Sequence, residues 1–260
     1  MVPPPQRTVL SGPALVRLLA RLGETDVQAS SQPLADRLSQ WLGWTDAIAL
    51  STVLSAPAPA MGRGGRSNGE DEAQHCLSLR SALSKAIVTD GVLAPPRPPV
   101  RHGRAQQAAP VQEAPEMPAD YAVYRQCYLA LQQKMETDIG DMRSRLRNRL
   151  ASQSSAMAKL AALDAVMERS MAVRERNLLG TLPGLLGKYY ERQRKAAQLA
   201  QAQADTAAQA KAEDQAEPRA QVPPGTWLSA FRKDMQSILL AELDVRFQPV
   251  EGLIAALRTR

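Results

Sequence analysis

The sequence has few aromatic residues and shows no alternating pattern of the kind that strands need. Aromatic residues make up 4% of the 260 residues, so a hydrophobic core has to be built mainly from leucine, alanine, methionine and valine. These side chains, with Gln, Arg and Glu at the polar positions, favour helix because straight-chain residues lose little rotamer freedom there. The composition therefore predicts an all-α fold.

Cysteines and long apolar runs are also scarce. The two cysteines, Cys76 and Cys127, are too few for a disulfide framework, and neither lies in a CxxC pair. Prolines open the N-terminal run and Arg17 and Arg21 interrupt its apolar stretch, unlike an export signal. No uncharged apolar run approaches the roughly 18 to 20 residues of a membrane span. We therefore expect a cytoplasmic protein with reduced cysteines and no membrane span.

Motifs that carry catalysis or cofactor binding are missing as well. The sequence has no phosphate-binding glycine loop, nucleophile elbow or paired-histidine helix motif, and GRGG at 62–65 lacks the GK[ST] ending. His75 and Cys76 are neighbours, which point about 100° apart on a helix and cannot chelate one ion together. We expect no enzyme, and hence no catalytic residues, cofactor, metal site or small-molecule substrate.

The 19 prolines of the chain help to divide it into segments. Residues 1–92 predict a small N-terminal helical module, with helix starts at Pro13 and Pro33 and an internal flexible loop at 56–69. Residues 93–118 are rich in proline and predict a linker. Residues 119–200 predict long amphipathic helices, 201–225 an Ala/Gln-rich linker, and 226–260 a C-terminal amphipathic helix that Pro249 bends or restarts.

The segment after the proline-rich linker carries the longest apolar stripe. From Tyr121 to Leu150 apolar residues recur at steps of three and four, as in a coiled coil. A weak break at 152–155 leaves two geometries open, an antiparallel helical hairpin or a single long rod. The stripe is longer than a small domain usually needs, so we expect it to bind a second copy or another protein. The candidate protein-interaction face comprises Tyr121, Tyr124, Tyr128, Leu131, Met135, Met142 and Leu146.

Basic residues gather in the same region. Between positions 120 and 200 there are 14 basic and 8 acidic residues, an excess equal to the net charge of +6 of the whole chain. Arg143, Arg145, Arg147 and Arg149 alternate around Leu146, so on a helix they do not form one compact patch. The commoner interpretation is a solvated flank of a coiled coil, and the alternative is a phosphate-binding set for nucleic acid or an anionic leaflet.

The stretch ADRLSQWLGWTDAIALST, residues 35–52, places Trp41 and Trp44 on either side of Gly43. A glycine turn between two short helices is typical of helix-turn-helix DNA readers, but the second helix would carry no Arg, Lys, Asn or Gln to bond base edges. A ligand cradle between the tryptophans would lack polar groups to orient a ligand. We therefore predict a structural core made by Leu38, Trp41, Leu42, Trp44 and Ile48.

The stretches QRTVLSGPALVRLLARL, LADRLSQWLGWTDAIALS and LLAELDVRFQPVEGLIAALR resemble a bacterial family of domain-of-unknown-function proteins of about this length. The resemblance covers residues 6–54 and 226–258 and brings no catalytic residues. It implies a gene neighbourhood similar to clusters that encode inner-membrane proton-channel subunits of the stator and Tol type, with OmpA-like partners. We expect a non-enzymatic helical adaptor or scaffold that mediates protein–protein interaction as an accessory to such a complex. A nucleic-acid-associated protein is the alternative.

Overall fold

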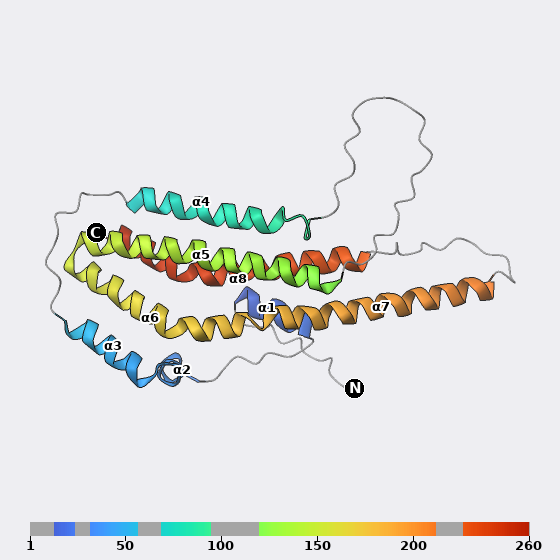
Figure 1. Ribbon diagram of the computed structural model, residues 1–260, viewed down its shortest axis with the longest axis horizontal. Coiled ribbons are helices and arrows are strands. Elements are labelled where there is room, and N and C mark those ends of the chain that lie inside the picture. Colours follow the sequence, from blue (N-terminus) through green and yellow to red (C-terminus); the bar gives the residue numbers. More distant parts are fainter. Residues whose placement is uncertain (1–12, 24–31, 57–68, 95–119, 212–225, 260) are drawn as a thin grey trace, which may run out of the picture.

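The computed structural model describes residues 13–23, 32–56, 69–94, 120–211 and 226–259 of the chain, and within these ranges it contains helices and no strand (Figure 1). The all-α prediction is confirmed for this part of the chain. None of these helices combines the length and apolar character that a bilayer crossing requires. The helices are α1 (Ala14–Gly23), α2 (Leu34–Trp41), α3 (Trp44–Ser55), α4 (Gly69–Val88), α5 (Tyr121–Gln153), α6 (Ser155–Leu179), α7 (Leu182–Lys211) and α8 (Thr226–Arg258).

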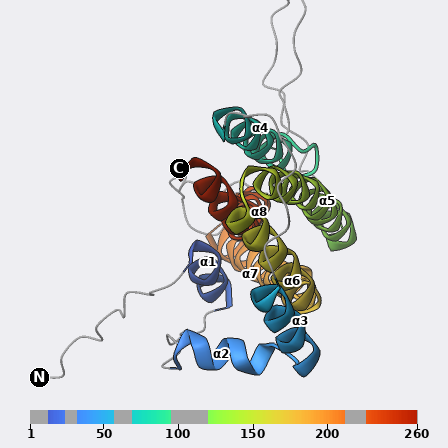
Figure 2. The same cartoon turned by 90° about the vertical axis from the view of Figure 1, so that its left-hand side faces the viewer.

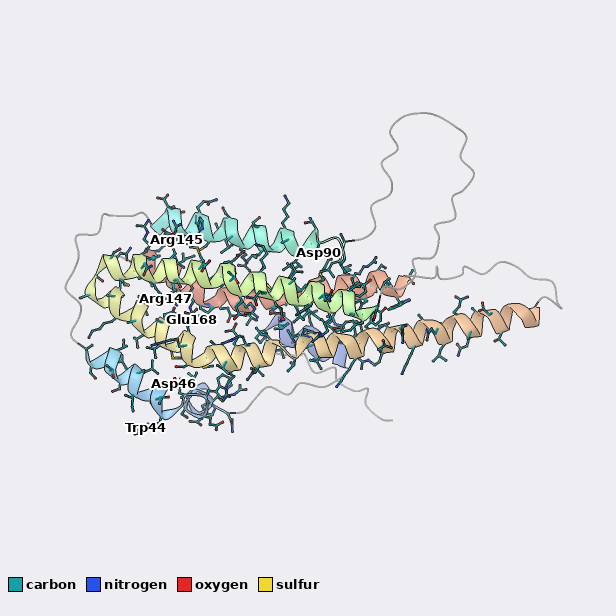
Figure 3. The ribbon with its side chains drawn as sticks, viewed as in Figure 1. Trp44, Asp46, Asp90, Arg145, Arg147 and Glu168 are labelled. Carbon is teal, nitrogen blue, oxygen red and sulfur yellow. The ribbon has the colours of Figure 1, made fainter. Side chains whose placement is uncertain are left out.

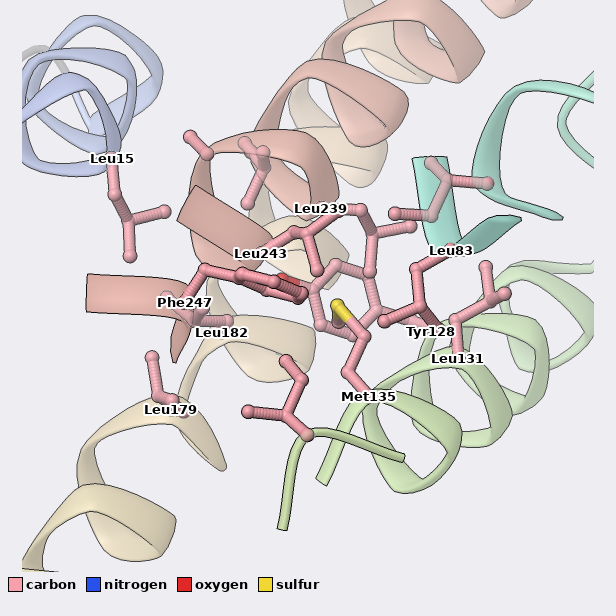
Figure 4. Packing of buried hydrophobic residues seen from close by; sticks show 14 of the residues in the cluster. Leu15, Leu83, Tyr128, Leu131, Met135, Leu179, Leu182, Leu239, Leu243 and Phe247 are labelled. Atoms are coloured by element: carbon pink, nitrogen blue, oxygen red, sulfur yellow. The ribbon is translucent and has the colours of Figure 1, made fainter. Parts of the chain in front are cut away.

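The centre of the molecule is a bundle of long helices in which α5 and α8 pack side by side and α4 lies along both. Asp120 caps the N-terminus of α5, and its side chain accepts a hydrogen bond from the backbone N–H of Ala122 at 3.3 Å. Because apolar residues recur at steps of three and four, one face of each long helix is apolar and turns towards the others. Figure 4 shows part of the resulting core, which includes Leu83, Tyr128, Leu131, Met135, Leu239, Leu243 and Phe247.

A sharp turn at Ser154 connects α5 to α6. The Ser154 side chain accepts a hydrogen bond from the backbone N–H of Met157 at 3.2 Å and so caps the N-terminus of α6. Helix α6 then returns alongside α5, which makes the segment an antiparallel hairpin and not a single rod (Figure 1). The serine that weakens the apolar pattern is the residue that turns the chain.

Helix α7 follows α6 after Gly180 and Thr181 and extends past the ends of α5 and α8 (Figure 1). Its first part packs on the bundle through the buried Leu186 and Tyr190, whereas every side chain from 201 to 206 is exposed. The segment predicted as a linker from 201 therefore begins as a helix that reaches Lys211, with exposed side chains from 201 to 206. Residues 212–225 lie outside the described ranges.

Helix α8 runs without interruption from Thr226 to Arg258, with Pro249 inside it. Of the two alternatives that the sequence left open for Pro249, a bend or a restart, the uninterrupted helix excludes the restart. Phe247, Val250 and Leu253, on both sides of the proline, are all buried in the core. Their packing offsets the backbone hydrogen bond that proline removes, so the helix continues.

The helices of residues 1–92 do not build a core of their own. Helix α1 packs on α8 and α7, α3 packs on α6, and α4 packs on α8 and α5, so each makes its main contacts with the C-terminal half. Figure 2 shows α4 on one side of the bundle and α2 and α3 on the opposite side. Leu93, predicted as the first position of the linker, is buried in the shared core, and the folded part continues to Ala94. Residues 57–68 of the loop predicted at 56–69, and residues 95–118 of the linker predicted at 93–118, lie outside the described residues.

Candidate protein-interaction surface

The apolar stripe of α5 is the interior of this protein. Tyr124, Tyr128 and Leu146 have an exposed fraction of 0%, and Tyr121 is partly buried against the same core. The prediction that this stripe is an available interaction face is wrong, because α8 covers it. The residues concerned are Tyr121, Tyr124, Tyr128, Leu131, Met135, Met142 and Leu146, all of which belong to the core or pack against it.

Two of the four arginines hold the hairpin together. Arg143 donates from Nε and Nη2 to both carboxylate oxygens of Asp164, at 2.8 and 2.6 Å. Arg147 donates from Nη1 to Asp164 at 3.1 Å and to Glu168 at 2.5 Å. Figure 3 shows Arg147 and Glu168 between α5 and α6. Since these side chains are largely buried, the pairs fix how α6 returns along α5.

The other two arginines bind the start of α4. Arg145 and Arg149 donate to the two carboxylate oxygens of Glu72, with Nε distances of 2.8 and 3.0 Å. Glu72 is almost fully buried, and burial alone would raise its pKa, but the hydrogen bonds and positive charges of the two arginines outweigh burial and lower it. All four arginines of the candidate phosphate-binding set are therefore paired with carboxylates of the same chain.

A second buried polar network lies between α5 and α8. Glu242, with an exposed fraction of 0%, accepts hydrogen bonds from Tyr128 Oη at 2.7 Å, Gln132 Nε2 at 3.0 Å and Arg246 Nε at 2.9 Å. Arg246 also contacts Glu175 of α6 at 3.4 Å. Burial, with the nearby charge of Glu242, raises the pKa of the Tyr128 hydroxyl, so it remains a donor at neutral pH. The network joins α5, α6 and α8, and its charged groups are hydrogen-bonded or ion-paired with one another.

A groove of about 530 Å³ opens beside this network, between α5, α6 and α8. Met135, Ile139 and Leu179 are among its apolar lining residues, while Arg246 belongs to both the groove and the Glu242 network. Trp41 of α2 also lines the groove, and the guanidinium of Arg174 lies 5.2 Å from the centre of its ring. Three ion pairs lie around the groove, Arg143 with Glu168, Arg176 with Glu136 and Arg246 with Glu175, so it combines an apolar lining with a largely paired rim.

The thiols have the properties of packed residues. Cys76 is buried, and burial and the nearby charge of Glu72 raise its pKa to about 11. Burial and the contact with Asp90, whose carboxylate lies 3.2 Å from the Cys127 sulfur, raise the pKa of Cys127 to about 12. A thiolate is therefore rare at neutral pH at either position. Among the described residues no group of histidines, cysteines and carboxylates is arranged to hold a metal ion.

The predicted core around the tryptophans is wrong. Trp44 is 81% exposed and Ile48 is 50% exposed, while Leu38, Trp41 and Leu42 are only partly buried. The physical reason is that α3 packs on α6 through its opposite face, and none of its residues is fully buried. Figure 3 shows Trp44 at the outer edge of the molecule, on the side of α3 away from α6.

Polar contacts fix α3 in this position. Asp46 accepts a hydrogen bond from the backbone N–H of Gly43 at 3.0 Å, which closes the turn between α2 and α3. Its other oxygen accepts a hydrogen bond from the Ser170 hydroxyl of α6 at 2.8 Å. The Ser170 bond and then the Gly43 bond lower the pKa of Asp46, so the carboxylate stays charged. The only charged side chain of α3 is thus turned inward, and the outer face carries no charge.

The sequence profile of one protein family matches the chain over residues 1–259, and that family is described as protein of unknown function (DUF3348). The chain belongs to the DUF3348 family. No curated protein and no solved structure matches it. The resemblance expected from both ends of the sequence is therefore confirmed and extends over nearly the whole chain.

In this DUF3348 protein, sequence reasoning missed that α3 exposes large apolar residues. One signal was available: of the 12 residues from Trp44 to Ser55, Asp46 is the only charged one. A short helix without charges can be an interior helix or an exposed apolar one, and periodicity does not distinguish them. Whether such a helix is interior or exposed depends on which of its faces packs against a neighbour. Here only one face of α3 packs, against α6, and this is visible only in the structure.

Proposed function

We propose that this DUF3348 protein is a non-enzymatic helical scaffold that binds protein through the outer face of α3. The observation that carries the proposal is the exposure of Trp44, at 81%, on a face that also exposes Ile48 and Leu54 and has no charge. Single exposed apolar residues are ordinary, but a tryptophan within an uncharged apolar face marks an interaction site. Tryptophan is also enriched among the residues that dominate binding energy in protein interfaces.

The way α3 is held supports the same function. The Asp46 contacts to Gly43 and Ser170 and the stacking of Arg174 on Trp41 fix the turn and both short helices against α6. A surface that is rigid before binding loses less conformational entropy when a partner arrives. The bundle therefore serves as a support, and α3 is the element that it presents.

The nucleic-acid alternative has less support. Each of Arg143, Arg145, Arg147 and Arg149 is paired with Asp164, Glu168 or Glu72, so binding a phosphate would require breaking an existing ion pair. Association of cationic side chains with phosphate backbones gains free energy from counterion release. That gain is smaller where the cation is already neutralised by a carboxylate.

The partner class that the family resemblance implies is a subunit of an inner-membrane proton-channel complex. The proposal is tested by capturing proteins from the native host with the tagged full chain, after nuclease treatment and solubilisation of membranes. Three forms are compared: the unchanged chain, Trp44→Arg, and Leu199→Arg. Leu199 is the matched control because it is 64% exposed on the projecting part of α7.

The expected result is a protein recovered in stoichiometric amount with the unchanged chain and Leu199→Arg and lost with Trp44→Arg. Circular dichroism of the variants should be unchanged, because both substitutions lie on exposed surface. Equal recovery with all three forms would overturn the proposal. Material that disappears after nuclease treatment would favour the nucleic-acid alternative.

A further inference from the structure

The exposed residues of α3 follow the spacing of a coiled-coil seam. Trp44, Ile48, Ser51 and Ser55 are separated by four, three and four residues and are all exposed. The positions that flank this seam are exposed as well, and none of them is charged; they are Thr45, Ala47, Thr52 and Leu54. Eight of the 12 residues of α3 therefore form one continuous uncharged surface.

The remaining positions of the repeat face α6. They are the only partly buried residues of α3: Asp46, Ala49, Leu50 and Val53. Asp46 accepts the hydrogen bond from Ser170, which fixes the inward direction of this face. The seam thus points away from the bundle, and Figure 3 shows its first residue, Trp44, at the outside.

Side-chain size is unevenly distributed along the seam. The N-terminal half carries the large residues, Trp44 and Ile48, and the C-terminal half carries the small ones, Ser51 and Ser55. A shallow, open depression lies over the small end, lined by Ile48, Ser51, Thr52, Ser55 and Ala56. The surface therefore has a protruding end and a hollow end.

We propose that the partner of this face is a second copy of the same chain, docked with the two α3 helices antiparallel about a two-fold axis. This inference rests on the proposed function and takes a second copy, not a channel subunit, as the protein bound by the α3 face; the endogenous copy is then the protein that the tagged chain captures from the host. In antiparallel pairing Trp44 lies opposite the partner's Ser55, and Ile48 lies opposite the partner's Ser51. Every layer of the seam then pairs one large side chain with one small one, as packing to interior density requires.

Other arrangements fit less well. A parallel pair would place Trp44 against the partner's Trp44 and Ser55 against the partner's Ser55, which crowds one end and leaves a void at the other. A two-fold interface uses the same patch on both copies, so a charged patch would repel itself. The outer face of α3 carries no charge, and two copies can meet there without that cost.

The size of the face indicates that this dimer is weak. A helix of 12 residues is about 18 Å long at a rise of about 1.5 Å per residue. Each tryptophan buries about 150 to 250 Å² in an interface, and the whole pair falls short of the roughly 1,200 Å² of a standard interface. We therefore expect reversible association with a dissociation constant in about the micromolar range.

Analytical ultracentrifugation of the full chain over a wide concentration range tests the association. The unchanged chain should convert from monomer to dimer, and Trp44→Ala should weaken dimerisation by about thirty-fold, as for a central interface residue. Ser55→Phe should also weaken it, because the large side chain fills the hollow that receives Trp44. Leu199→Ala is the control and should leave the dissociation constant unchanged. A chain that stays monomeric throughout, or a dimer unaffected by both α3 variants, would overturn the inference.

Cysteine crosslinking tests the direction of pairing. An equal mixture of Ile48→Cys and Ser51→Cys should form a disulfide-linked dimer on mild oxidation, whereas each variant alone and the unchanged chain should not. Crosslinking of each variant with itself would indicate parallel helices and overturn the antiparallel arrangement. If Trp44→Arg abolishes capture of a host protein while the chain is monomeric and does not crosslink, this inference fails and the proposed function stands. If Trp44→Arg changes neither the capture of a host protein nor the association of the chain with itself, both this inference and the proposed function fail.

Discussion

Helices α5 and α3 both carry an uncharged seam with steps of three and four residues, and they use it differently. The seam of α5 lies against α8, where Tyr128 and Leu146 are fully buried. The seam of α3 points outward, and Trp44 is 81% exposed. The same local pattern therefore produces a core in one helix and a surface in the other. The difference is set by which neighbour covers the seam, and that neighbour can be more than a hundred residues away in the sequence.

The largest expected effect comes from charge inside the bundle. Arg246→Met leaves the fully buried Glu242 without its guanidinium partner and should lower the free energy of unfolding by about 3 to 5 kcal/mol. Arg80→Met is the control, because Arg80 pairs with Asp244 and Glu251 in exposed positions, and it should cost about 1 kcal/mol or less. Urea denaturation at pH 7 measures both. Similar losses of unfolding free energy in the two variants would contradict the view that Glu242 depends on Arg246 as its buried partner.

The two seams can be compared directly by truncating one residue in each. Leu146→Ala removes a fully buried side chain of α5 and should cost about 2 to 5 kcal/mol of unfolding free energy. Ile48→Ala removes an exposed side chain of α3 and should change it by no more than about 0.5 kcal/mol in dilute solution. The same denaturation experiment applies. A large loss for Ile48→Ala in the monomer would show that α3 belongs to the core after all.

Close packing at the aromatic end of the bundle gives a smaller effect. A Cβ atom at Gly187 of α7 would lie 2.8 Å from the ring of Tyr121, so Gly187→Ala should cost about 1 to 3 kcal/mol through overpacking. Gly184 has nothing within 4 Å of such a Cβ, and Gly184→Ala should stabilise the helix by about 0.5 to 1 kcal/mol. The melting temperatures of the two variants should therefore move in opposite directions. A shift of the same sign would contradict the close contact with Tyr121.

An effect of about the same size as that of Gly187→Ala depends on pH. The pKa of Glu72 is lowered from its ordinary value of 4.5, so the folded chain holds the proton less tightly than the unfolded chain. Its contribution is complete above pH 4.5 and is lost as the pH falls through the lowered pKa. Glu72→Gln should cost about 1 to 3 kcal/mol at pH 7, and the difference from the unchanged chain should shrink below pH 4.5. A difference in unfolding free energy that stays constant from pH 7 to pH 3 would show that the charge of Glu72 does not stabilise the fold.

Much of the fold could be predicted from the sequence because the signals are local. Pro13 and Gly23 predict the limits of α1, and the stripe from Tyr121 to Leu150 identifies the buried face of α5. The serines near 154 indicate a break, although the hairpin could only be distinguished from a rod once Asp164 and Glu168 were seen to meet Arg143 and Arg147.

The candidate site could not be predicted, because it depends on long-range pairing. Nothing near Arg145 in the sequence shows that Glu72 will neutralise it, since the two are 73 residues apart. Glu242 likewise meets Tyr128 across 114 residues. Burial of Trp44 and Ile48 is the ordinary expectation for such side chains, and it fails here because α3 contacts α6 through its opposite face.

Thiol labelling of one introduced cysteine per variant tests most directly that the apolar face of α3, and not that of α5, is accessible. The variants Ile48→Cys and Leu146→Cys are each treated with a thiol reagent under native conditions, at a concentration where the chain is monomeric. Mass spectrometry identifies which cysteine is labelled. The buried Cys76 of both variants serves as an internal reference. Ile48→Cys should react within the time of mixing, while Leu146→Cys should react only as fast as Cys76. Protection at position 48 with rapid labelling at position 146 would contradict the assignment of the two seams.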